Sequence, residues 1–165
     1  MYLSKEEYRQ MYPGGEESGF EAAAYEAERI MDTQTTGIDR VRKLQRFFPT
    51  DEYDVKAVKH CAGKLIHTIL QIQKAEAAAE DARGYETTEN GIRGKVISSV
   101  SAGNESISYT TAGGAGASAI DAAVKDRTER ERLLCGITLD YLRGVDDANG
   151  ISLLYMGAYP GRYLC

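Results

Sequence analysis

A long amphipathic stretch, Tyr53 to Arg83, constrains what this chain of 165 residues can fold into more than any other part of the sequence. Its apolar side chains recur at spacings of three and four residues, which places them on one side of an α-helix: Val55, Val58, Ala62, Leu65, Ile69 and Ile72. Three more apolar residues widen this stripe: Cys61, Ile66 and Leu70. Thr50 or Asp51 can cap the first amides. The sequence therefore predicts one long helix with a buried first half and an alanine-rich second half that faces solvent or a partner.

Two shorter helices are expected before it. Ser4 followed by Glu7 is a capping box, so a short helix begins there and ends at Tyr12 to Gly15. A second helix begins near Ser18 and weakens at Thr35 to Gly37, because β-branched residues and glycine are poor helix formers. The following connection, 38–48, is basic and partly helical, with four positive side chains: Arg40, Arg42, Lys43 and Arg46.

The rest of the chain mixes a hairpin, a helix and an apolar end. Lys95 to Ser101 and Ser106 to Thr110 are predicted strands of one β-hairpin, joined by Ala102 to Glu105. A last helix runs from Ser118, its cap, to about Arg143. We expect a mainly α fold: a small bundle of about four helices over 1–150, with one β-hairpin at 94–110 and an extended C-terminal tail at 151–165.

Composition excludes some classes of function. The net charge is −5 and the pI is about 5.1, so the chain is not a basic nucleic-acid-binding protein. We see no signal peptide and expect no membrane contact, because apolar runs are too short to span a bilayer. Cys61 and Cys135 lie in apolar helical stretches, which indicates small core residues in a reducing environment, whereas Cys165 is expected to be exposed.

No pattern for catalysis, metal or cofactor is found. His60 and His67 are seven residues apart, whereas two metal ligands on one helix are usually three or four apart. No serine or cysteine lies in a nucleophile-elbow context. Asp146 to Gly150 lacks the alternating oxygen ligands and closing glutamate of a calcium loop, so it is expected to be a plain turn. We therefore expect no enzyme, no cofactor and no metal.

The C-terminal tail is the most apolar exposed segment that the sequence predicts. It either folds back onto its own core or binds another chain, and its candidate partner-binding residues are Leu153, Leu154, Tyr155, Met156, Tyr159 and Tyr163. We expect removal of Ile151 to Cys165 to leave a folded helical bundle that has lost its docking segment.

The order of these parts resembles the head–tail connector (head-completion or adaptor) proteins of tailed phages and prophages. The resemblance covers nearly the whole chain, including FEAAAYEAERIMDTQT at Phe20 to Thr35. It is sharpest in the serine-rich hairpin VISSVSAGNESISY, Val96 to Tyr109, and in the last helix TLDYLRG followed by LLYMG at Leu153 to Gly157. The chain departs from the family in its long polar insert, Ala75 to Arg93, and in its tyrosine-rich end after Pro160.

The resemblance implies a structural virion protein at the head–tail interface, made in the bacterial host cytoplasm. Such adaptors form a homo-oligomeric ring, dodecameric on the portal protein, that extends the DNA channel and carries the stopper or tail-completion protein. DNA passes without sequence-specific binding. Ring contacts join two different faces of neighbouring subunits, and the candidate interface residues here are Ala23, Ala27, Arg127, Glu131, Val96 and Tyr109.

Two other functions remain open on the sequence. The chain is alternatively a tail-completion or other phage assembly protein, which would bind tail tubes and not the portal. It is alternatively a small cytosolic regulatory module that binds a peptide, in which case its gene would lie away from portal and capsid genes.

Overall fold

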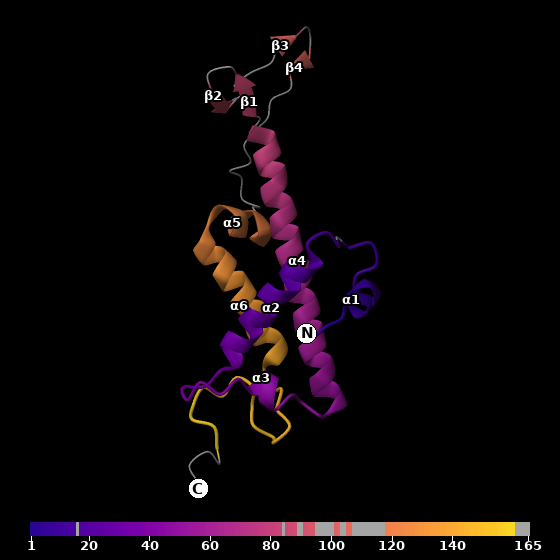
Figure 1. Ribbon diagram of the computed structural model, residues 1–165, viewed down its shortest axis with the longest axis vertical. Helices are drawn as coiled ribbons and strands as arrows, with labels where there is room; N and C mark the ends of the chain where they lie inside the picture. The colour runs from indigo at the N-terminus through magenta and orange to yellow at the C-terminus, as the bar shows by residue number, and fades with distance from the viewer. Residues whose placement is uncertain are drawn as a thin grey trace.

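The computed structural model describes residues 1–15, 17–83, 85–88, 91–94, 101–102, 105–106 and 118–160. Within these residues the chain is mainly helical, which confirms the mainly α part of the predicted fold class, with six helices where about four were expected. Figure 1 shows an elongated molecule, in which the long helix α4 runs along the bundle and continues past it at one end. The short helix α3 and the last described loops lie at the other end, so the two ends of the subunit differ in structure.

Helix α4, Glu52–Arg83, confirms the long helix expected from the apolar stripe. The amide of Tyr53 donates to Asp51 Oδ1 at 2.9 Å, so Asp51 is the residue that caps it. Val58 and Leu65 are fully buried, whereas side chains from Gln73 to Ala78 are exposed or half-buried. Helices α2, Phe20–Thr35, and α6, Arg127–Leu142, pack against α4 and against each other. The buried half of α4 is therefore the centre of the core.

Helix α1, Lys5–Met11, begins at the predicted capping box, and Tyr12 is its C-cap. The Glu7 carboxylate accepts hydrogen bonds from the backbone and hydroxyl of Ser4 at 2.9 Å each. Lys59 Nζ of α4 lies 2.5 Å from Glu7 Oε1 and joins the two helices. The Lys59 bond, followed by those from Ser4, lowers the pKa of Glu7 from 4.5 to about 2.

This carboxylate makes a pH-dependent contribution to stability. Because its pKa is lowered in the folded chain, the contribution is complete above pH 4.5 and is lost as pH falls toward 2. We expect Glu7→Gln to lower the free energy of unfolding at neutral pH by about 1 kcal/mol, a small value because solvent reaches the pair. The difference from wild type should shrink during acid titration followed by circular dichroism. Glu6→Gln, in the same turn and 74% exposed, is the control.

The predicted last helix is two helices. Helix α5, Ala119–Lys125, begins at the expected Ser118 capping box, but Asp126 has an extended backbone and ends it. The Asp126 carboxylate accepts the Thr128 amide at 2.7 Å and caps α6. The prediction of one helix was wrong because Asp126, with Glu129 three residues later, is itself a helix start signal inside a run of helix-forming residues. Helix α6 ends at Leu142, and Arg143 is its C-cap, before the left-handed Gly144.

The β structure differs from the prediction. Strands β1, Tyr85–Thr88, and β2, Gly91–Gly94, form an antiparallel pair just after α4. Strands β3, Ser101–Ala102, and β4, Glu105–Ser106, pair Ser101 with Ser106 and Ala102 with Glu105. The hairpin expected over 94–110 is not supported, because nearly all of its predicted strand residues lie outside the described residues. Ala102 and Glu105 are paired in the structure, whereas they were expected in the connection.

Candidate functional site at the C-terminal end of the bundle

Two segments that are far apart in sequence meet at the lower end of the bundle in Figure 1. One is the connection after α2, which contains α3, Lys43–Arg46, and the other is the chain after α6. Each segment is folded back on itself by one antiparallel bridge, Thr36 to Arg42 and Asp146 to Ser152. The two are joined by backbone bonds, since Ile38 N donates to Met156 O at 2.9 Å. The tail therefore folds back onto its own chain.

Lys43 is the main link between the two segments. Its side chain is 1% exposed, and Nζ donates to the carbonyl oxygens of Ser152 at 3.1 Å, Leu153 at 2.8 Å and Tyr155. Burial lowers the pKa of the Lys43 ammonium, and the carboxylates of Asp147 and Asp39 oppose that shift. Because an ammonium has three donors, the three carbonyls satisfy it fully. Lys43 thus fixes the path of the tail.

Asp147 organises the turn after α6. It is 5% exposed, and its Oδ1 accepts the amides of Asn149 at 2.8 Å and Ile151 at 3.0 Å. Tyr159 Oη donates to its Oδ2 at 2.6 Å, and burial together with this contact raises the pKa of Tyr159. The ring of Tyr159 stacks on Phe47 with centroids 4.6 Å apart. The turn expected at Asp146 to Gly150 is therefore present, and its one buried side chain, Asp147, holds Tyr159 in place.

The backbones of the two segments come into close contact at Gly37. A Cβ at this position would lie 2.5 Å from the carbonyl oxygen of Gly157, so no other residue fits without a shift of the tail. Next to it, Asp39 Oδ2 accepts the Tyr159 amide at 3.0 Å. The Thr35 to Gly37 signal does end α2, as predicted, and Gly37 also provides space for the tail.

The predicted partner-binding residues divide into two groups. Leu153 is fully buried and belongs to the core, Tyr159 is 7% exposed and Leu154 is half-buried against the core. These three side chains pack inside the chain, which corrects their assignment to a partner. Tyr155 and Met156 remain 46% and 55% exposed. Tyr163 lies outside the described residues.

The exposed group has a third member that the sequence did not single out. Ile38 is 79% exposed, and its amide is bonded to Met156. We call Ile38, Tyr155 and Met156 the apolar patch. Lys43 Nζ lies 5.7 Å from the centroid of the Tyr155 ring, so a cation–π interaction with the buried lysine also holds the Tyr155 ring of this patch in place. Three adjacent apolar side chains in solvent are a candidate contact surface for another protein.

The predicted subunit-interface residues are also divided. Ala23 and Ala27 are fully buried, and α2 uses them to approach α4 within one chain, so they are withdrawn as contacts between subunits. Arg127 and Glu131 lie on the outer side of α6, 2.9 Å apart, with side chains 90% and 61% exposed. Val96 and Tyr109 lie outside the described residues.

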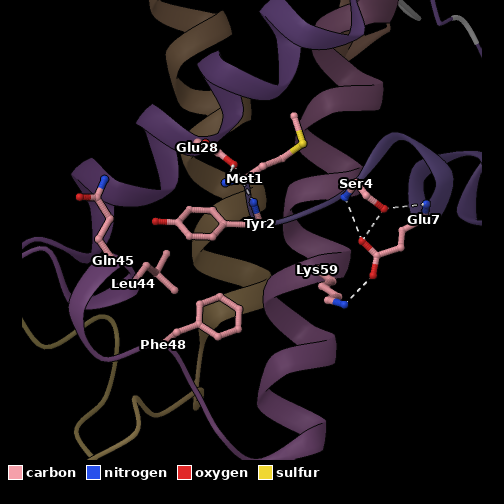
Figure 2. Close-up of a pocket in the computed structure, with 9 residues that line it drawn as sticks. All are labelled: Met1, Tyr2, Ser4, Glu7, Glu28, Leu44, Gln45, Phe48 and Lys59. Atoms are coloured by element: carbon pink, nitrogen blue, oxygen red, sulfur yellow. Dashed lines mark hydrogen bonds and ion pairs between the residues drawn. The ribbon is translucent and has the colours of Figure 1, made fainter.

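A separate cavity of about 660 Å³ lies between the N-terminus, α2, α3 and α4 (Figure 2). Its charges pair among themselves: Lys59 with Glu7, and the Met1 amino group with Glu28 at 3.2 Å. Tyr2 stacks on Phe48 with centroids 5.9 Å apart, and its hydroxyl donates to Asp32 at 2.5 Å. The burial of Tyr2 and its bond to Asp32 raise its pKa. Paired charges leave this cavity poorly suited to a charged ligand.

His67 and Cys61 lie in packing environments, whereas His60 is exposed. His67 stacks on Tyr12 with centroids 4.3 Å apart, and its Nδ1 is 3.2 Å from Tyr8 Oη. Burial lowers the pKa of His67 and raises that of Cys61 to about 12. Cys61 is buried as predicted, whereas Cys135 is partly exposed. No group of three metal-binding side chains occurs among the residues that the structure describes.

No model of a known protein family matches this chain, and no match is found among curated proteins or solved structures. Across the part of the chain that the structure describes, none of the helices combines the length and apolar character needed to cross a membrane.

Sequence reasoning missed Lys43 and Asp147 as the centre of this end of the molecule. Lys43 was one of four positive residues in a basic connection, and Asp147 was one of several acids in a turn. The acceptors of Lys43 are backbone carbonyls more than a hundred residues away. Because every residue has a backbone carbonyl, the sequence does not indicate which ones accept these bonds.

Proposed function

We propose that this chain is the subunit of a head–tail connector of a tailed phage, which forms a homo-oligomeric ring below the portal protein. The observation that carries the proposal is the apolar patch. Its residues belong to the connection after α2 and the chain after α6, two segments that lie together at one end of an elongated subunit (Figure 1). The other end carries the projecting half of α4. A subunit with a docking surface at one end and a projecting helix at the other can contact one assembly at each end, as a connector between head and tail must.

Charge is consistent with this role. A net charge of −5 leaves the protein unable to neutralise many phosphates, so DNA would slide through a ring of such subunits without being held. Val96 and Tyr109, which lie outside the described residues, remain predicted contacts between neighbouring subunits. It assigns the chain no catalytic reaction and no cofactor. The protein would reside at the head–tail interface of the virion.

Binding to purified portal rings tests the proposal. We expect the double variant Tyr155→Ser and Met156→Ser to bind the portal at least about tenfold more weakly than wild type, because the two largest apolar contacts of the patch are lost. Co-sedimentation of chain with portal measures this. Leu139→Ser, on α6 and 42% exposed, is the matched control and should bind normally.

Other outcomes separate the rival functions. Wild-type binding to tail tubes in place of portal rings would identify a tail-completion protein. Binding to neither assembly would remove the connector proposal and favour a regulatory module that binds a peptide. Equal portal binding by the double variant and by wild type would show that the apolar patch is not the docking surface.

A further inference from the structure

An arginine-rich groove lies on the outer side of α2. It has a volume of about 660 Å³, and its basic side chains are Arg29, Arg40 and Arg42, all exposed. Tyr25, on the same outer line of α2 as Arg29, is 72% exposed. None of the three arginines forms an ion pair with another described residue. An acidic protein thus presents three unneutralised guanidinium groups beside an exposed aromatic ring.

The two carboxylates of this groove are already engaged. Glu28 accepts the Tyr2 amide at 2.6 Å and lies 3.2 Å from the Met1 amino group. Asp32 accepts Gln45 Nε2 at 2.5 Å and the Tyr2 hydroxyl. Both donors to Asp32 are neutral, so its charge remains in the groove, where three arginines outnumber this one carboxylate that no cation neutralises. The phosphates of a nucleic acid are closely spaced and bind best to a continuous basic stripe, which carboxylates among the arginines would interrupt. Such a groove is better suited to the separate carboxylates of a protein, which arginine binds through paired hydrogen bonds.

A surface of the opposite charge lies on another side of the same end. We call it the acidic face: Asp51, Glu52, Asp54, Asp140 and Asp146. Its parts are joined, since Asp146 N donates to Asp54 Oδ2 at 3.3 Å. Asp140 and Tyr53, which is 78% exposed, line one cavity together with Lys56 and Arg143, so the five carboxylates outnumber two cations on this face. No described residue forms an ion pair with these five carboxylates. Figure 1 shows the end of α2 and the start of α4 on opposite sides of the molecule.

We propose that the arginine-rich groove of one copy binds the acidic face of a second copy. The two surfaces complement each other in sign, and each carries an exposed tyrosine that can be covered in the contact. Because they are different surfaces on different sides, the contact is head-to-tail and repeats from copy to copy, as in a ring. This inference rests on the proposed ring and identifies the two faces that form it.

Charge reversal with the full chain alone tests the inference. The groove variant is Arg29→Glu with Arg42→Glu, and the acidic-face variant is Glu52→Lys with Asp140→Lys. We expect wild type to self-associate at low ionic strength in analytical ultracentrifugation, and each variant to do so at least about tenfold more weakly, because like charges then face each other. An equimolar mixture of the two variants should associate again, since each supplies the face that the other lacks.

Two controls separate loss of the specific contact from a change in net charge and from a loss of folding stability. Lys74→Glu on α4 with Lys125→Glu on α5 replaces two exposed cations, changes the net charge as the groove variant does and should leave association unchanged. Arg40 has φ 60°, a conformation that glycine adopts without strain. Arg40→Gly should therefore weaken association while the melting temperature is not lowered.

Three results would overturn the inference: a wild-type chain that stays monomeric at every concentration tested at low salt, equal loss in the control with Lys74 and Lys125 replaced, or no recovery in the mixture. Binding of short duplex DNA by wild type, lost in the groove variant, would assign the groove to nucleic acid. Failure to bind the portal with self-association intact would remove the connector proposal and leave these two faces in place.

Discussion

Replacement of Lys43 by methionine is expected to lower the free energy of unfolding by about 3 kcal/mol. Methionine fills a similar volume but donates no hydrogen bond. The carbonyls of Ser152, Leu153 and Tyr155 would then lose their shared donor in a place that water does not reach, since Lys43 is 1% exposed. Chemical denaturation followed by far-ultraviolet circular dichroism measures the change.

The matched control is Lys56→Met. Lys56 is an exposed lysine in the first turns of α4, so the same chemical change there should alter stability by no more than about 0.5 kcal/mol. If Lys43→Met and Lys56→Met unfold at the same denaturant concentration, the buried ammonium does not hold the tail in solution. Proteolysis gives a second reading, because release of the tail in Lys43→Met should expose the bonds around Met156 to cleavage.

This link changes what removal of the tail is expected to do. The sequence predicted that the bundle remains folded without Ile151 to Cys165. In the structure that removal takes away the acceptors of Lys43 and the core side chain of Leu153. A truncated chain would keep a buried charge with no partner, which is strongly destabilising. Point substitutions in the apolar patch therefore test docking, whereas truncation tests folding and docking together.

Local signals in the sequence predicted the helices well. The capping boxes at Ser4 and Ser118 begin helices in the structure, and the apolar stripe of α4 is its buried side. These features depend on residues within one or two turns of each other, so periodicity and capping contain the needed information. The break at Asp126 was also local and was missed because the surrounding residues favour helix.

Features that depend on distant segments could not be predicted in the same way. The alanines of α2 indicate close helix packing, but a sequence does not say whether the neighbour belongs to the same chain. The structure places Ala23 and Ala27 inside the chain. Likewise, an apolar tail is expected to find apolar surroundings, and only the positions of Lys43, Gly37 and Asp147 decide that these are its own core.

Leu153→Ala is expected to lower the free energy of unfolding by about 3 kcal/mol. The Leu153 side chain is fully buried in the core cluster, and its amide donates to Val145 O at 2.9 Å. The backbone bond survives in the variant, so the loss comes from the removed apolar contacts and the cavity that replaces them. Urea denaturation measures it, with the slope of the transition expected to stay as in wild type.

Met156→Ala is the matched control, three residues further along the same tail. It removes a comparable amount of apolar side chain from a position that is 55% exposed, so we expect a change of no more than about 0.5 kcal/mol. If the tail is detached in solution, Leu153→Ala and Met156→Ala would lower the free energy of unfolding by the same small amount. That result would make Leu153 a candidate partner-binding residue again. A large difference between them means that the tail up to Leu153 serves the fold. In that case the docking function we propose is left to the side chains of the apolar patch.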